Sequence, residues 1–148
     1  RKSAPGPDQP PAGPSDAGEA ALLARFAGMS VLLAEDEPLN REVIVSLLAD
    51  LEVEVAVDGV EAVRLAAAHR YDLVILGVQL PRMDGLEAAR RIREIAGYAS
   101  VPMIALTASG CDDDRSRSMQ AGMEAFLTKP VDSRTLFKTV FNLLSRQR

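Results

Sequence analysis

The chain has 148 residues, 47% of them hydrophobic but only 4% aromatic, with a formal charge of −4. This length suits one domain with an aliphatic core and some chain to spare. The acidic charge and the lack of a basic, aromatic-rich stretch argue against nucleic acid binding, and no apolar run approaches the roughly 18 residues that span a bilayer. The single cysteine, Cys111, excludes an internal disulfide, which predicts a cytoplasmic location without membrane contact by this segment. Because the sequence begins with Arg1 rather than Met, we expect a fragment of a longer protein, and that protein could be membrane-anchored.

The first 28 residues divide into two segments. Residues 1–18 contain five prolines and three glycines but no Val, Ile, Leu or aromatic residue, so they are predicted to form a disordered linker. In residues 19–28 a short helix would place Leu22, Leu23 and Phe26 on one face and end at Gly28. We expect this lead-in segment to pack on the folded domain, which is predicted to cover residues 29–148.

From residue 29 onward, strand and helix patterns alternate. Apolar runs predict strands at 31–35, 53–57, 72–76, 101–107 and 125–129, and helical periods begin near Pro38, Val60, Asp84 and Asp112, with a last one at 133–146. Alternation in the second run predicts a half-buried edge strand. Asp58 and Asp84, each followed by glycine, predict a turn and a helix N-cap, and Gly122 is expected to end the fourth helix. Five strand–helix units predict an α/β fold with a doubly wound parallel sheet.

Reactive side chains follow the predicted strands where each one ends. Glu35 and Asp36 follow the first strand, Thr107 ends the fourth and Lys129 ends the fifth, so all should meet at the carboxyl edge of the sheet. Two adjacent carboxylates favour a bound cation such as Mg²⁺, and a hydroxyl and an ammonium group opposite them could hold phosphoryl oxygens. The third strand, in contrast, ends at Gly77, which has no side chain. Asp72 begins that strand and is expected at the opposite edge.

Four ordered motifs carry a resemblance to a known family: LLAEDEPLNREV, YDLVILGVQLPRMDG, MIALTAS and AFLTKPVD. Together they resemble the receiver domain of two-component response regulators over residues 29–146, and the EDEPLNRE wording resembles receivers attached to hybrid sensor histidine kinases. The resemblance implies a flavodoxin-like (βα)5 fold with strand order 2-1-3-4-5. It also implies a partner, either a histidine kinase or a histidine phosphotransfer domain, or upstream domains of the same polypeptide.

The resemblance also assigns roles to the residues at the carboxyl edge. It implies that Glu35 and Asp36 bind Mg²⁺ and that Gln79 completes the metal shell through its backbone carbonyl. Thr107 and Lys129 are implied to contact the phosphoryl group. The implied switch residues are Thr107 and the aromatic Phe126.

Gly77 stands where the family has the aspartate that accepts the phosphoryl group. The resemblance therefore predicts a receiver that cannot be phosphorylated, holds Mg²⁺ weakly and acts by docking to other proteins. Two origins stay open, a naturally degenerate receiver and an engineered loss of the acceptor, and the otherwise intact shell favours the second. Asp84 is expected to cap a helix rather than to replace the acceptor. Without phosphorylation we expect a weak homodimer or none.

Two other functions are compatible with the sequence. One is a phosphatase-type enzyme on a similar fold, with Asp36 as the nucleophile and Thr107 and Lys129 in support. The other is an interaction module that never depended on phosphorylation. The domain itself is not expected to be an enzyme, although its parent protein would be a histidine kinase. A further departure from the family is the short connection ADLEVEV between the first helix and the second strand.

Overall fold

The computed structural model describes residues 26–108, 112–129 and 131–146. The predicted linker and most of the lead-in segment, including Leu22 and Leu23, lie outside these residues, as does Cys111. Phe26, near the end of the lead-in segment, is buried, and its ring meets the ring of Phe141 edge-on with 5.7 Å between centroids. The described end of this segment therefore packs on the domain, as predicted.

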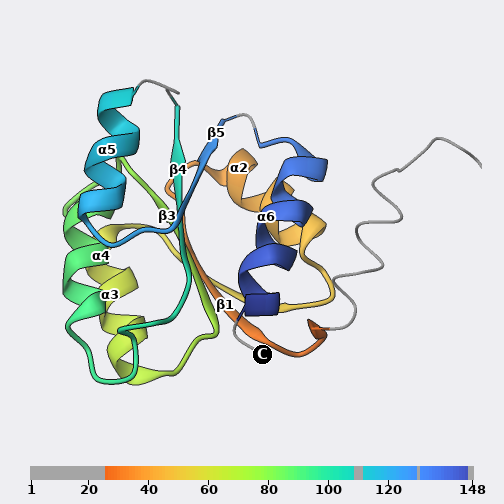
Figure 1. The fold of residues 1–148 in the computed structure, drawn as a ribbon, viewed down its shortest axis with the longest axis horizontal. Coiled ribbons are helices and arrows are strands. Elements are labelled where there is room, and N and C mark those ends of the chain that lie inside the picture. Colours follow the sequence, from red (N-terminus) through yellow and green to blue (C-terminus); the bar gives the residue numbers. More distant parts are fainter. Residues whose placement is uncertain (1–25, 109–111, 130, 147–148) are drawn as a thin grey trace, which may run out of the picture.

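Strands and helices alternate through the described residues. The order is β1 (Ser30–Ala34), α2 (Pro38–Leu47), β2 (Glu52–Ala56), α3 (Gly59–Ala68), β3 (Leu73–Gly77), α4 (Gly85–Arg93), β4 (Met103–Thr107), α5 (Asp112–Gln120), β5 (Ala125–Thr128) and α6 (Ser133–Arg146). All neighbouring strands are parallel, in the order β2-β1-β3-β4-β5. Helices α3, α4 and α5 cover one face of the sheet, and α2 and α6 cover the other (Figure 1). The predicted fold class and strand order are confirmed.

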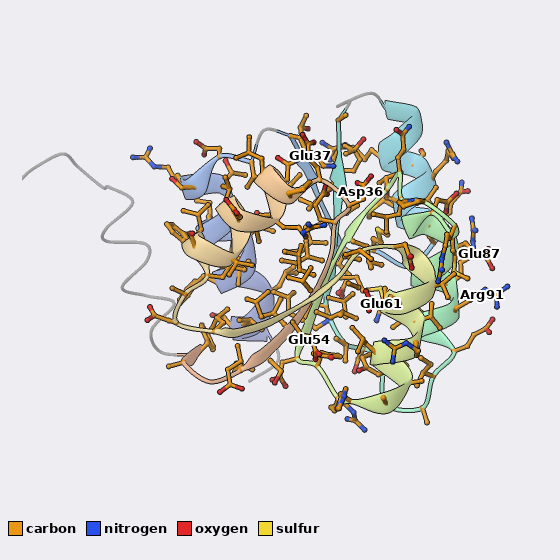
Figure 2. The ribbon with its side chains drawn as sticks, turned by 180° about the vertical axis from the view of Figure 1, so that it is seen from behind. Asp36, Glu37, Glu54, Glu61, Glu87 and Arg91 are labelled. Atoms are coloured by element: carbon orange, nitrogen blue, oxygen red, sulfur yellow. The ribbon has the colours of Figure 1, made fainter. Side chains whose placement is uncertain are left out.

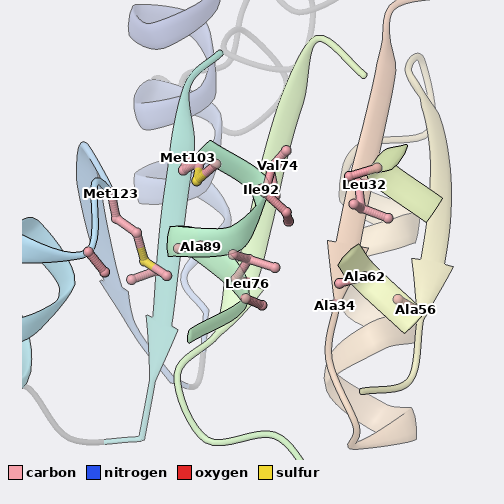
Figure 3. Packing of buried hydrophobic residues seen from close by; sticks show 14 of the residues in the cluster. Leu32, Ala34, Ala56, Ala62, Val74, Leu76, Ala89, Ile92, Met103 and Met123 are labelled. Carbon is pink, nitrogen blue, oxygen red and sulfur yellow. The ribbon is translucent and has the colours of Figure 1, made fainter. Parts of the chain in front are cut away.

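The core consists of two apolar layers, one on each face of the sheet. Because successive side chains of a strand point to opposite faces, Val31 and Leu33 of β1 face α2 and α6, whereas Leu32 faces α3 and α4. The layer that contains Leu32 also contains Val74 and Leu76 of β3 and Ala89 and Ile92 of α4 (Figure 3). Strands β1, β3 and β4 are almost fully buried, so the polar groups on which function depends must lie where these strands end.

Capping groups fix where the helices begin and end. Pro38 is the first residue of α2, a position at which its missing N–H leaves no hydrogen bond unmade. Asp58 accepts a hydrogen bond from the backbone N–H of Glu61 (2.8 Å), and Asp84 accepts one from that of Glu87 (2.9 Å). Both aspartates are thus N-caps, so the cap predicted at Asp84 is confirmed. Gly122 follows α5 with φ of +100°, a conformation that favours glycine.

The predicted strand limits are wrong by one or two residues. Strands β1 and β3 each lie one residue from their predicted position, which places Gly77 inside β3. Strand β2 ends at Ala56 because the chain then turns toward the cap at Asp58, and Val57 is 48% exposed rather than part of the strand. Strand β4 begins at Met103, not at residue 101, because Pro102 has no N–H to donate to the ladder. Strand β5 ends one residue before Lys129.

No helix among the described residues is long and apolar enough to cross a membrane.

Two glycines meet where β3 passes into α4. The amide of Gly85 donates to the carbonyl of Val78 (2.9 Å), and a Cβ on Gly85 would lie only 1.9 Å from the carbonyl oxygen of Gly77. Real Cβ atoms do not approach a backbone oxygen so closely, so a side chain at residue 85 would push α4 away from the end of β3. The close contact requires glycine here and holds the start of α4 against the sheet edge.

Gly85→Ala is therefore expected to destabilise the domain, although alanine is favoured over glycine within helices by about 1 kcal/mol. Overpacking costs typically about 1–3 kcal/mol, and the backbone atoms in contact here cannot rotate away, so the clash should dominate. Denaturant melts measure the difference. Gly28→Asn is the control, since a Cβ at residue 28 meets no atom within 4 Å and asparagine tolerates the φ of +86°. A Gly85→Ala variant as stable as the parent would show that the start of α4 does not need glycine.

Candidate functional site

The carboxyl ends of the strands bring four of the predicted site residues to one edge of the sheet. Residues at alternate positions of a strand lie on the same face of the sheet. Glu35 therefore shares a face with Val31 and Leu33, and Gly77 shares it with Leu73 and Ile75. The backbone N–H of Lys129 donates to the carbonyl of Thr107 (2.7 Å), which extends the pairing of β4 with β5 by one residue. Glu35, Gly77, Thr107 and Lys129 therefore meet at this edge, as predicted.

A buried ion pair joins the two outermost of these residues. The carboxylate of Glu35 is completely buried, and the Nζ of Lys129 lies 2.9 Å from its Oε1 and 3.0 Å from its Oε2. Oε2 accepts hydrogen bonds from Lys129 and from the backbone N–H of Glu37 (3.1 Å). Oε1 is in ion-pair contact with the same ammonium. Lys129 thus compensates both oxygens of the buried carboxylate.

The loop after β1 holds the second acidic residue. Asp36 is exposed, and Figure 2 shows it with Glu37 near one end of the sheet, whereas Glu54 lies toward the other. The guanidinium of Arg41 donates to the carbonyls of Glu35 (3.1 Å) and Asp36 (3.2 Å). These bonds tie the loop after β1 to α2. The sequence patterns did not single out Arg41. The signal for its contacts is an arginine in the first turns of the helix that follows an acidic pair.

The missing side chain of Gly77 points directly at Glu35. A Cβ built on Gly77 would lie 3.1 Å from Oε1 of Glu35, 3.2 Å from Cδ2 of Leu80 and 3.4 Å from the carbonyl of Ala34. The first of these contacts is tight and would require the Glu35 side chain to shift by a few tenths of an ångström. A longer side chain at residue 77 would therefore project beside the buried carboxylate, at the centre of the edge.

The remaining predicted site residues lie around this centre. Thr107 is buried, Gln79 is exposed in the loop that follows β3, and Phe126 is half-buried in β5. The guanidinium of Arg115 lies over the ring of Phe126, 5.0 Å from its centroid, at a distance typical of a cation–π contact. The roles that the resemblance implies for these residues stay predictions.

Two further aspartates lie where the sequence predicted them. Asp72 is at the opposite edge of the sheet, where its Oδ2 accepts a hydrogen bond from the backbone N–H of Ser30 (2.9 Å). Asp84 uses its Oδ1 to cap α4, so its carboxylate is engaged in helix capping. Neither aspartate replaces the missing side chain at residue 77.

The donor groups of this edge fit a weakly held Mg²⁺. Glu35 and Asp36 supply carboxylate oxygens, although both oxygens of Glu35 already contact the Lys129 ammonium, at 2.9 and 3.0 Å. The described residues contain no cluster of three or more His, Cys, Asp or Glu side chains that could hold a metal. Any magnesium here would depend on two carboxylates, backbone oxygen and water.

Known proteins resemble this chain at the level of sequence. A family model described as the response regulator receiver domain matches residues 31–141. Response regulator Rre1 of Synechocystis sp. is 38% identical over 123 residues, which make up 81% of this chain and 53% of that protein. Sensor histidine kinase RcsC of Salmonella typhimurium is 30% identical over 122 residues, or 81% of this chain and 13% of the kinase. The chain thus spans about half the length of Rre1 and a small part of RcsC.

Solved structures resemble it in fold. The receiver domain of sensor histidine kinase PA1611 from Pseudomonas aeruginosa, described with a magnesium ion coordinated in its active site cleft, has a TM-score of 0.75 and 38% identity, covering 80% of this chain and 99% of that chain. The co-crystal structure of the Saccharomyces cerevisiae histidine phosphotransfer protein Ypd1 with the receiver domain of response regulator Ssk1 gives a TM-score of 0.75 at 28% identity, covering 82% of this chain and 92% of that chain.

Removing Lys129 should leave the buried charge of Glu35 uncompensated. Breaking one partner of a buried pair costs about 3–5 kcal/mol, and we expect Lys129→Met to lie near the lower limit because the lysine side chain keeps 19% exposure. The double variant Glu35→Gln/Lys129→Met should recover much of this loss, since it removes both charges. Urea melts of the parent, the two single variants and the double variant measure the coupling. Additive losses would contradict it.

Proposed function

The chain belongs to the response regulator receiver domain family, and we propose that it is a two-component receiver module that cannot itself take up a phosphoryl group. The observation that carries this proposal is Gly77. It ends the central strand β3, and a Cβ there would lie 3.1 Å from Oε1 of the buried Glu35 carboxylate. An acyl phosphate needs a carboxylate oxygen as nucleophile, and glycine offers none.

The neighbouring carboxylates of the described residues are not placed to replace that nucleophile. The carboxylate of Glu35 is buried and paired with Lys129, and that of Asp84 caps α4. Asp36 is exposed in the loop after β1, and its described contacts do not favour the phosphatase alternative, in which it would be the nucleophile. In this proposal Lys129 neutralises the charge of Glu35 permanently. In a receiver that has the acceptor aspartate, the lysine would also contact the phosphoryl group.

Magnesium, in this proposal, binds weakly through Glu35, Asp36 and the backbone carbonyl of Gln79. When bound it would offset the repulsion between the carboxylates and would polarise a phosphoryl oxygen. Support comes from the adjacent acidic residues Glu35 and Asp36 and from the magnesium described in the similar PA1611 receiver. Lys129 competes with the cation for the same carboxylate, which is a further reason for low affinity.

The proposed partner is a histidine kinase or a histidine phosphotransfer domain, and the proposed parent is a hybrid histidine kinase. The similarity to segments of the sensor kinases PA1611 and RcsC supports the parent, and the complex of Ssk1 with Ypd1 supports the partner. Leu39 and Val43, one turn apart on α2, are 66% and 37% exposed beside the acidic loop. Exposed apolar side chains at this position suit a helical partner whose histidine approaches the sheet edge.

Phosphorylation tests the proposal directly. Radiolabelled acetyl phosphate with Mg²⁺ should leave the parent chain unlabelled, whereas Gly77→Asp should gain a label that hydroxylamine removes, as expected of an acyl phosphate. Gly77→Asn is the matched control, because it adds a side chain of the same size without a carboxylate. Stoichiometric labelling of the parent, or failure of a folded Gly77→Asp variant to label, would contradict the proposal.

Metal dependence gives a second test. In metal-free buffer Gly77→Asp should be less stable than the parent, because a third carboxylate joins the edge and its Cβ crowds Glu35. A ligand present at ten times its Kd stabilises a protein by about 1.4 kcal/mol. We therefore expect 10 mM Mg²⁺ to raise the melting temperature of Gly77→Asp more than that of the parent. Equal shifts in the parent, Gly77→Asp and Gly77→Asn would contradict the assignment of the metal to this edge.

A further inference from the structure

Arg82 has an unusual backbone conformation. Its φ is +66°, and it is the one non-glycine residue with positive φ among the described residues. A side chain makes this region unfavourable, and such strain persists only where surrounding contacts enforce it. Arg82 lies in the loop between β3 and α4, residues 78–84, which also contains Gln79.

Two contacts from the start of α3 enforce the conformation of this loop. The Nε of Arg82 lies 3.1 Å from Oδ2 of Asp58, whose side chain is almost buried. The other oxygen of Asp58 caps α3. At Gly59 an added Cβ would lie 1.9 Å from the carbonyl oxygen of Met83, so the first turn of α3 is in direct backbone contact with the loop.

The same loop is also fixed to the site. Its two ends are held together, because the amide of Gly85 donates to the carbonyl of Val78. The strand ends beyond it are joined as well, since the amide of Glu35 donates to the carbonyl of Ala56 (3.1 Å) at the end of β2. The loops that follow β1, β2 and β3 are therefore linked, and the ion pair of Asp58 with Arg82 joins the second to the third through side chains.

We propose that Asp58 and Arg82 are positioning residues for the metal site, and that their ion pair holds the loop 78–84 so that the backbone carbonyl of Gln79 faces the acidic pair. This inference rests on the proposed function. An ion pair with a partner as exposed as Arg82, at 63%, contributes little to stability. The hydrogen bond from the Met83 amide to the Pro81 carbonyl (2.7 Å) closes a tight turn over Arg82, and the ion pair with Asp58 fixes that turn against the start of α3.

Amide hydrogen exchange of the parent chain without metal tests the positioning. Arg82→Asn removes the ion pair but tolerates positive φ, and Asp58→Asn removes it while keeping a side chain that caps helices well. In both variants the amides of Met83 and Gly85 should exchange roughly tenfold faster than in the parent, while the amides of β1 and β4 are unchanged. Arg91→Gln, which breaks the exposed pair with Glu87 on α4 (Figure 2), is the control and should leave the loop unaffected. Unchanged exchange in both loop variants would overturn the inference.

Magnesium affinity in the Gly77→Asp background gives the second measurement. Removing partners that orient a metal ligand typically lowers affinity about 10–100-fold, and we expect about threefold to tenfold here because Arg82 is largely exposed. Arg82→Gly separates positioning from stability, since it relieves the strain and should keep or raise the melting temperature while magnesium binding weakens. Equal affinity in all Arg82 and Asp58 variants would overturn the inference. If Gly77→Asp itself binds no magnesium, the proposed function fails, and the claim that the pair positions the metal site fails with it.

Discussion

The buried pair of Glu35 with Lys129 is the interaction on which the rest of the carboxyl edge depends. A carboxylate with no solvent exposure needs a compensating cation, and here the cation comes from the far side of the sheet, just after β5. The pair therefore spans the ends of the central strands and requires them to finish level with one another. Gly77 ends β3, which lies between β1 and β5 in the sheet, and the carbonyl of Thr107 accepts from the backbone N–H of Lys129, so both residues lie at the same edge as the pair.

The behaviour of the Glu35–Lys129 pair depends on the glycine at the end of β3. A carboxylate at residue 77 would share the lysine with Glu35 and crowd it, and the distribution of charge would then depend on metal and on phosphorylation. With glycine, Lys129 keeps its pairing with Glu35 and has no reason to move. In the function proposed above, the edge then holds one arrangement, and signals would act through surfaces such as the exposed side of α2 rather than through a change of charge at its centre.

The sequence predicted the parts of this site that depend on local patterns. Apolar runs located the strands, and parallel topology then placed Glu35, Thr107 and Lys129 at one edge. The parts that it did not predict depend on contacts between loops distant in sequence. Pro81 before Arg82 is compatible with a turn that has positive φ, but the contact with Asp58 does not show in the local sequence. The errors of one or two residues in the strand limits arise because hydrophobicity does not show where the ladder of hydrogen bonds stops.

The two edges of the sheet differ in the kind of contact that satisfies their polar groups, hydrogen bonds at one and a buried ion pair at the other. At the amino edge the hydroxyl of Tyr98 donates to the carbonyl of His69 (2.6 Å) and accepts from the amide of Tyr71 (3.1 Å), while the hydroxyl of Tyr71 donates to Glu54. Burial, and then the bond to Glu54, raise the pKa of Tyr71, which keeps its hydroxyl protonated as a donor.

At the carboxyl edge, by contrast, the fully buried carboxylate of Glu35 depends on the ammonium of Lys129 and on the backbone N–H of Glu37, and Arg82 has positive φ in the loop after β3. Strained backbone conformations cluster at functional sites, which agrees with the candidate site at this edge. In the function proposed above, Gly77 deprives this edge of a phosphoryl acceptor, while Glu35, Thr107 and Lys129 still meet there.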